Sequence, residues 1–229
     1  MHYVETLMFM LKQMRQIVKE VYLKTKGKPY MLSLKESLID CRIILDVGCG
    51  SGSPIKPFSK NFYSVGADLF KPALLESKKK RIHNDYVLLD INNLCFRSNF
   101  FDAVLALDVI EHLEKTKGLR LIKTMENIAK KKVVLITPNG FVPQGVLAKN
   151  VFQVHLSGWT VSELKRLKYI VHGIVGLKLL RTEEAKLKYK PDFCFSEISD
   201  ISQKLTYHFP IMAFELLCIK IIQKEKRNA

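Results

Sequence analysis

The chain has 229 residues, of which 48% are hydrophobic and 26% are charged, a balance typical of globular domains that excludes a disordered or fibrous chain. No apolar run reaches the roughly 18 residues that span a bilayer, and Glu5, Lys12 and Arg15 argue against a secretion signal. The formal net charge of +15 comes from dispersed basic residues, which predicts a lysine-rich solvated surface, with RNA binding as the alternative.

Cysteine usage predicts a reducing compartment. The chain has five cysteines, an odd number, and they are widely spaced without a Cys-x-x-Cys pair. We therefore expect free thiols in a cytoplasmic protein.

An amphipathic helix is predicted over residues 4–22, where apolar residues recur every three or four positions with basic residues between them. Gly27 and Pro29 end this helix, and a short helix over residues 32–39 leads into the first strand. We expect residues 1–40 to form a helical extension that packs on the central domain. Its apolar face could instead cover the substrate or contact a partner or a membrane surface.

The segment 43–54 combines a buried strand with a glycine-rich turn. Its apolar start predicts a parallel strand that is buried on both faces, with Asp46 at the carboxyl end. Three glycines then allow a sharp turn and close approach to a ligand: Gly48, Gly50 and Gly52. Pro54 suits the first turn of a following helix. The segment therefore predicts a nucleotide-binding corner.

The glycine spacing indicates which nucleotide to expect. A dinucleotide fingerprint would need glycine at position 53, which is Ser53, and a P-loop would need a Gly-Lys-Ser/Thr sequence that does not follow. The pattern Asp-x-Gly-x-Gly-x-Gly resembles the first motif of class I S-adenosylmethionine-dependent methyltransferases, in the ubiquinone-biosynthesis and general small-molecule branch. A carboxylate at Asp46 would suit that cofactor's ammonium and sulfonium charges and would repel a pyrophosphate. A structural tight turn is the alternative.

Two further predicted strands end in acids. Residues 62–68 end at Asp68, where a carboxylate can accept both ribose hydroxyls, and Leu69 follows as apolar surface for the adenine. A helix over residues 71–81 comes next. Residues 86–91 form a third strand that ends at Asp90, and the resemblance implies that Asp90 and its neighbours recognise the adenine amino group. Each acid could instead only cap a helix or a turn.

A fourth strand over residues 101–107 runs into a segment that, in these methyltransferases, lies where methyl donor and acceptor meet. Methyl transfer from a sulfonium is an in-line displacement, so positioning and exclusion of water dominate, and a base is needed only if the acceptor loses a proton. We expect Asp108, His112 and His155 as catalytic residues. The resemblance implies one cofactor-binding set drawn from the strand ends and the glycine turn: Asp46, Gly48, Cys49, Gly50, Gly52, Asp68, Leu69, Asp90, Ile91 and Leu107.

A metal-assisted alternative comes from Glu111-His112. In methyltransferases that modify the 3′-terminal ribose of small RNAs, a Glu-x-x-Glu-His element and a later His before Trp-Thr bind a divalent cation. This chain has Asp108 at the first position and His155 before Trp159-Thr160. Asp108, Glu111, His112 and His155 could thus bind Mg²⁺ or Mn²⁺. Metal-independent relatives share the pattern, so we expect no metal, with Glu111 at a helix N-terminus.

The remaining chain predicts the acceptor side. A fifth strand over residues 132–138 precedes a loop to Ser157, which we expect to bind the acceptor through its aromatic and polar residues: Phe141, Phe152, Gln153, His155 and Trp159, the last of which could equally belong to the core. Thr160 caps a helix that continues to Tyr169, and strands follow over residues 170–180 and 211–222. We expect an insertion at about 181–210 to influence which acceptor the protein methylates.

Together these elements predict a doubly wound, Rossmann-like α/β methyltransferase fold over residues 41–229. Its seven-stranded sheet is mostly parallel, with an antiparallel last strand. We expect S-adenosylmethionine-dependent methylation of a small molecule or of a lipid- or glycan-linked acceptor, with S-adenosylhomocysteine as product. The alternatives are a metal-assisted RNA 2′-O-methyltransferase and a non-catalytic S-adenosylmethionine-binding module. The acceptor atom and the oligomeric state are not specified.

Overall fold

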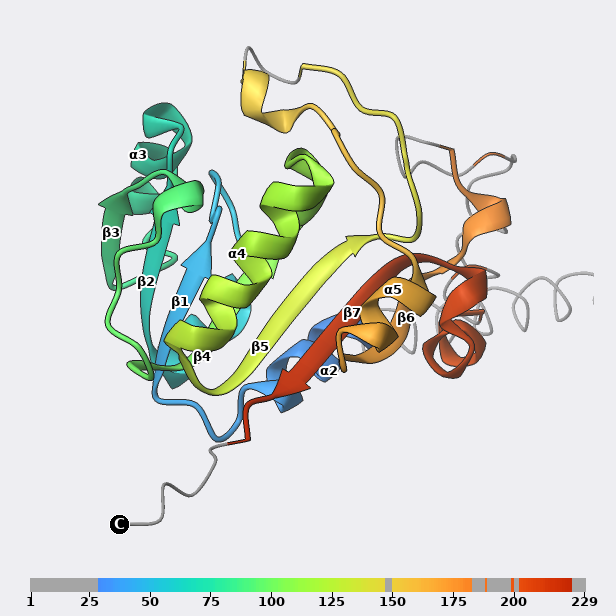
Figure 1. Ribbon diagram of the computed structural model, residues 1–229, viewed down its shortest axis with the longest axis horizontal. Coiled ribbons are helices and arrows are strands. Elements are labelled where there is room, and N and C mark those ends of the chain that lie inside the picture. The colour runs from blue at the N-terminus through green and yellow to red at the C-terminus, as the bar shows by residue number, and fades with distance from the viewer. Residues whose placement is uncertain (1–28, 147–149, 183–187, 189–198, 200–201, 224–229) are drawn as a thin grey trace, which may run out of the picture.

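The computed structural model describes residues 29–146, 150–182, 188, 199 and 202–223 (Figure 1). The helix predicted over residues 4–22 and most of the insertion predicted at about 181–210 lie outside these residues. Within the described part of the chain, no helix combines the length and the apolar character needed to cross a bilayer.

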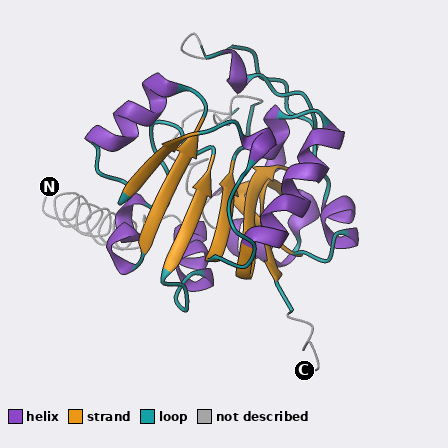
Figure 2. Cartoon of the chain, turned by 60° about the vertical axis from the view of Figure 1, so that its left-hand side comes forward, coloured by secondary structure: helices purple, strands orange, loops and turns teal. Residues whose placement is uncertain are grey.

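A seven-stranded sheet runs through the middle of the molecule, with helices on both faces (Figure 2). Its spatial order is β3-β2-β1-β4-β5-β7-β6. In chain order the strands are β1 (Ile43–Val47), β2 (Tyr63–Asp68), β3 (Asp85–Leu88), β4 (Phe101–Leu107), β5 (Ala129–Pro138), β6 (Ile170–Leu177) and β7 (Ala213–Ile221). β7 pairs antiparallel with both of its neighbours, and the other pairings are parallel. The predicted fold, including its antiparallel last strand, is confirmed.

The central strands are apolar because the sheet is covered on both faces. All seven residues of β4 are buried, as are four of the five in β1. α4 (Lys115–Ile128) and α5 (Val161–Arg166) contribute to the hydrophobic cluster on one face, whereas α2 (Pro29–Ser37) contributes to the other. α3 (Lys71–Lys79) follows β2. With both faces covered, ligands have access chiefly at the strand ends.

The helix predicted to begin near Pro54 is absent, which corrects that expectation. A short 3₁₀ helix over Lys56–Asn61 takes its place, and Phe58 within it has non-helical backbone angles. Pro57 explains the difference, since an α-helix that began at Pro54 would need the backbone N–H that Pro57 lacks. The chain therefore leaves the glycine turn as a compact loop.

Trp159 lies in the core, so the expectation that it lines the acceptor loop is wrong. Its side chain is fully buried, and a Cβ added to Gly118 in α4 would lie 2.7 Å from its Cζ2 atom. Lys115 Nζ lies 3.8 Å from the ring centroid, close enough for a cation–π contact. A glycine in α4 therefore makes the space for the indole.

Several other element boundaries differ from prediction, and a local cause explains the first of the two described next. The third strand ends at Leu88 rather than at residue 91, because the Asp90 side chain accepts the Asn92 N–H and begins a 3₁₀ turn. The helix after Thr160 ends at Arg166 rather than near Tyr169. Its start is as predicted, since Thr160 and Glu163 form a reciprocal capping box.

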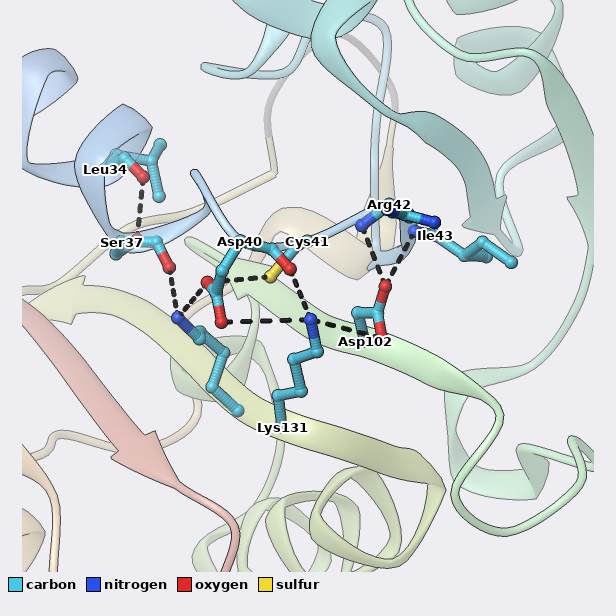
Figure 3. Close-up of polar contacts among 9 residues, drawn as sticks. Leu34, Ser37, Asp40, Cys41, Arg42, Ile43, Asp102 and Lys131 are labelled. Atoms are coloured by element: carbon cyan, nitrogen blue, oxygen red, sulfur yellow. Dashed lines mark hydrogen bonds and ion pairs between the residues drawn. The ribbon is translucent and has the colours of Figure 1, made fainter.

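Asp102 joins the amino-terminal ends of the central strands (Figure 3). Its Oδ2 accepts the N–H of Arg42 at 2.8 Å and that of Ile43 at 3.3 Å, at the start of β1. Its Oδ1 lies 3.8 Å from Lys131 Nζ in β5, and Lys131 also contacts the exposed Asp40. This network lies at the edge of the sheet opposite the glycine turn, so it has a structural role.

We predict that Asp102→Ala lowers the free energy of unfolding by about 1–3 kcal/mol, because two backbone N–H groups at a mostly buried site lose their acceptor. Urea unfolding measures this loss. Glu114→Ala, which removes an exposed acid paired with the exposed Lys117, is the control, and it should cost less than about 1 kcal/mol. Equal losses in the two variants would contradict the assignment.

Candidate functional site

Two adjacent cavities lie at the carboxyl ends of the parallel strands. The larger has a volume of about 560 Å³ and the smaller about 200 Å³. Gly48, Asp108, Asn150 and Gln153 line both of them. The strand order reverses between β1 and β4, and open α/β sheets bind ligands in the crevice at such a point. The two cavities thus form one cleft at the expected place.

Every residue predicted to bind the cofactor lines this cleft. The glycine turn and the ends of β1 and β4 contribute to the larger cavity: Asp46, Gly48, Cys49, Gly50, Gly52 and Leu107. The ends of β2 and β3 contribute to the smaller one: Asp68, Leu69, Asp90 and Ile91. Residues predicted from separate strands are therefore brought together, and their contact with a cofactor stays a prediction.

The Asp68 carboxylate ties the glycine turn to the end of β2. Its Oδ2 accepts the Gly50 N–H and its Oδ1 accepts the Phe70 N–H, both at 2.8 Å. Gly48 and Gly50 have positive φ angles of 69° and 54°, which favour glycine. Gly52 has no such angle and no crowding, so only close approach of a ligand would require glycine there.

Asp46 lies at the bottom of the larger cavity and is 1% exposed. The pKa of its carboxyl is raised to about 7, chiefly by burial; a hydrogen bond from Ser53 opposes this rise, and the nearby charge of Asp68 adds to it. Its Oδ2 lies 3.4 Å from Nε2 of His83. Sequence patterns gave no indication of His83, because its approach to Asp46 depends on the fold.

Asp90 combines both roles considered for it. Its carboxylate accepts hydrogen bonds from the backbone and side-chain nitrogens of Asn92, so it caps a turn. It also lines the smaller cavity beside Leu69 and Ile91. Capping therefore places an acid where an adenine amino group could donate to it.

Of the three predicted catalytic residues, Asp108 and His112 line the cleft, whereas His155 lines neither cavity and lies beside His112. Asp108 lines both cavities and has a φ of 57°, an uncommon conformation that is tolerated best by Gly, Asn and Asp. His112 lines the smaller cavity, and its ring centroid lies 4.8 Å from that of His155. Burial lowers the pKa of both imidazoles, so both are neutral near pH 7.

Hydrogen bonds fix how the two imidazoles are presented. Nδ1 of His112 lies 3.2 Å from the Val154 carbonyl, and Nδ1 of His155 lies 2.6 Å from the Val142 carbonyl. Because a carbonyl only accepts, each Nδ1 carries the proton and each Nε2 keeps a lone pair. The two rings are therefore able to act as bases or as metal ligands.

Glu111 completes a cluster with these imidazoles. One ligand atom each from Glu111, His112 and His155 lies within 4.8 Å of the others, whereas Asp108 lies outside this group. Glu111 is 2% exposed, Thr137 donates to its Oε2, and its Oε1 has no hydrogen-bond partner in the described part of the chain. Burial, and then the charge of Asp108, raise its pKa. Three of the four proposed ligands therefore fit a divalent cation.

The loop after β5 contributes residues to the cleft, and only some of them were predicted from the sequence. Phe152 and Gln153 line the cleft as predicted, and Asn150 joins them. Phe141 instead lines a separate, open cavity of about 850 Å³, beside Lys178 and Ile211. The length of the loop predicted that it would reach the cleft. The sequence did not indicate that its first part would line a different cavity from its last part.

Residues 45–137 match the family model described as a methyltransferase domain. Residues 45–137 therefore carry a methyltransferase domain. The match includes the glycine turn, Asp68, Asp90 and the segment 108–112, so the predicted resemblance is confirmed.

The methyltransferase domain is similar in sequence to the human protein named probable tRNA methyltransferase 9B, with 32% identity over 107 residues. It is also 28% identical over 114 residues to the tRNA (carboxymethyluridine(34)-5-O)-methyltransferase of Arabidopsis thaliana. These matches cover 46% and 50% of this chain but 23% and 26% of the relatives. The matched region is thus about a quarter of the length of these two relatives.

Solved structures share the fold of the methyltransferase domain at low sequence identity. An S-adenosylmethionine-dependent methyltransferase from Mesorhizobium loti has a TM-score of 0.55 and 15% identity, over 84% of this chain and 96% of its own. The methyltransferase domain of bacterial CtHen1-C has a TM-score of 0.55 and 16% identity, over 85% and 97%. These likenesses confirm the architecture.

We predict that Asp46→Asn makes the cofactor-free protein more stable above pH 7. The pKa of Asp46 is about 7 when folded against an ordinary value of 3.8, so the folded state holds the extra proton between these values and its stability falls as pH rises through them. Asparagine removes this loss. Thermal unfolding at pH 5 and pH 8 should show a variant advantage that is larger at pH 8. A less stable variant at pH 8 would contradict the assignment.

Proposed function

We propose that this chain transfers the methyl group of S-adenosylmethionine to an acceptor that enters beside Asp108 and His112. The observation that carries this proposal is the meeting of Asp46, the glycine turn and Asp68 in one cleft at the reversal of strand order. Bound S-adenosylmethionine would supply an electrophilic methyl group on a sulfonium. The protein would supply orientation and exclusion of water.

The residues of the cleft divide naturally between parts of the cofactor. Asp68 keeps lone pairs for ribose hydroxyls although both of its oxygens already accept backbone N–H groups. Leu69 and Ile91 offer apolar surface to the adenine, with Asp90 beside them. Asp46 offers the buried negative charge that suits the ammonium of the methionine part. His112, neutral and with Nε2 unprotonated, is the candidate base.

We favour a small molecule or a lipid- or glycan-linked acceptor. The space beside His112 is lined by Val109, Leu113 and Phe152, which give it an apolar character. Such a space suits a compact or apolar group. A cytoplasmic site of action is part of this proposal, and it is supported by the free thiols of Cys41, Cys49, Cys95 and Cys218.

A metal-assisted RNA 2′-O-methyltransferase is the second candidate. The cluster of Glu111, His112 and His155 supports it, because the orphaned Glu111 Oε1 and two unprotonated Nε2 atoms form a donor set suited to Mg²⁺ or Mn²⁺. A cation there would act as a Lewis acid beside the acceptor. The net charge of +15 and the similarity to proteins named as tRNA methyltransferases also support an RNA acceptor.

Transfer of a labelled methyl group into a total cell extract tests the two acceptor classes. We predict label in solvent-soluble material that survives a chelator, because neutral imidazole and positioning suffice for that chemistry. Chelator-sensitive label in RNA would favour the second candidate. Tight cofactor binding without label in any fraction would favour the non-catalytic binding module considered from sequence.

We predict that Asp68→Ala weakens the affinity for S-adenosylhomocysteine by at least about tenfold, since it removes a charged hydrogen-bond acceptor and the link to the Gly50 N–H. Isothermal titration measures the affinity. Asp85→Ala is the matched control, because Asp85 is an exposed acid at the start of β3 that accepts a hydrogen bond from Tyr63 Oη, and the affinity of this variant should stay unchanged. Unchanged affinity in Asp68→Ala would sink the cofactor assignment.

A further inference from the structure

His83 lies beside Asp46, one of the residues that line the larger cavity. It precedes β3 in the chain, yet its side chain is fully buried and its Nε2 lies 3.4 Å from Asp46 Oδ2 at the end of β1. Within the described part of the chain, neither of these two atoms has a hydrogen-bond partner. Buried polar atoms without partners are costly, so a pair left facing each other suggests a role.

The surroundings of His83 fix its ring and its tautomer. The backbone N–H of His83 donates to Tyr86 Oη at 2.8 Å, and Tyr86 Oη donates to the Ser77 carbonyl at 3.0 Å. Its Nδ1 lies 3.3 Å from the Ser64 hydroxyl, which is able to donate to it. With Ser64 as the donor to Nδ1, the proton of the neutral ring is on Nε2, the nitrogen that lies 3.4 Å from Asp46 Oδ2. Burial lowers the pKa of His83 to about 4, which keeps the ring neutral.

Gly66 makes room for this arrangement. A Cβ at position 66 would lie 2.5 Å from His83 Cδ2 and 3.0 Å from Cys49 Sγ. Gly66 pairs directly with Asp46 across β1 and β2. A side chain in the middle of β2 would therefore push the imidazole away from the carboxylate. The glycine, the imidazole and the acid form one unit behind the glycine turn.

We propose that His83 is a positioning residue that holds the Asp46 carboxylate for the ammonium of the methionine part of S-adenosylmethionine. This inference rests on the proposed function. When a cation is bound in the larger cavity, Asp46 is ionised, and the Nε2–H of His83 stabilises the carboxylate from the side away from the ligand. Ser53 donates to the same carboxylate, so His83 supplies a second donor at Oδ2.

Two amide substitutions separate this role from packing. In His83→Gln, the side-chain nitrogen reaches about as far as Nε2, so it can still donate to Asp46. In His83→Asn, the shorter amide reaches only about as far as Nδ1, so it can still contact Ser64 but cannot donate to Asp46. Both variants place a smaller polar group in the same buried space, which makes them a matched pair.

The readout is affinity for two ligands, measured by isothermal titration. S-Adenosylhomocysteine carries the amino acid part, whereas 5′-methylthioadenosine lacks it. We expect His83→Asn to weaken the affinity for S-adenosylhomocysteine by at least about tenfold and the affinity for methylthioadenosine by less than about twofold. His83→Gln should bind both ligands about as tightly as the wild type. Equal losses for both ligands, or no loss for S-adenosylhomocysteine, would overturn the proposal.

If a variant fails to fold, a measurement on the wild type still tests the proposal. The ¹⁵N resonances of His83 should report a neutral ring protonated at Nε2, and they should shift when S-adenosylhomocysteine is added but not with methylthioadenosine. A ring protonated at Nδ1 in the complex would contradict the proposal. A wild type that binds neither ligand would instead refute the proposed function, and this inference with it.

Discussion

The two hydrogen bonds that the Asp68 carboxylate accepts from Gly50 and Phe70 set the shape of the cleft. They attach the glycine turn to the neighbouring strand, although no α-helix follows the turn to support it. Lys80 strengthens the attachment, since its Nζ donates to the Ser51 carbonyl at 2.9 Å. With the turn held in place, Asp46 below it and Asp90 beside it face the same space. One carboxylate thus organises the residues expected around the cofactor.

Buried acids at the carboxyl ends of the strands are costly in the empty protein. Asp46 and Glu111 are 1% and 2% exposed, and burial raises the pKa of each. Each also keeps one oxygen without a hydrogen-bond partner among the described residues. The contrast with Asp102 is informative, because that acid at the opposite edge is fully used by backbone N–H groups and lysine. Asp46 and Glu111 therefore keep an unpaired oxygen at the carboxyl ends of the strands, whereas Asp102 supports the fold at the amino ends.

Sequence predicted the sheet well because its strands are short apolar runs that end in acids. β4 was placed without error over residues 101–107, where burial on both faces makes every residue after Asp102 apolar. The ten cofactor-binding candidates were also placed in one cleft, because parallel strands bring their carboxyl ends together. Local patterns were sufficient wherever the topology repeats.

Sequence failed where contacts between distant residues decide the outcome. Trp159 belongs to the core because Gly118 leaves space for it, and no local pattern connects these two residues. His83 escaped notice for the same reason, since its position depends on Gly66 and Asp46 in two other strands. The missing helix after the glycine turn was a different error, because Pro57 was visible in the sequence and its lost N–H was overlooked.

Amide hydrogen exchange with and without S-adenosylhomocysteine would test the central claim most directly, because it locates the ligand on the intact chain. The account predicts slower exchange at residues 48–53, 68–70 and 90–92, which line the two cavities, and no change at residues 177–182 beside the separate cavity. Protection confined to residues 177–182, or no protection at a saturating ligand concentration, would contradict it.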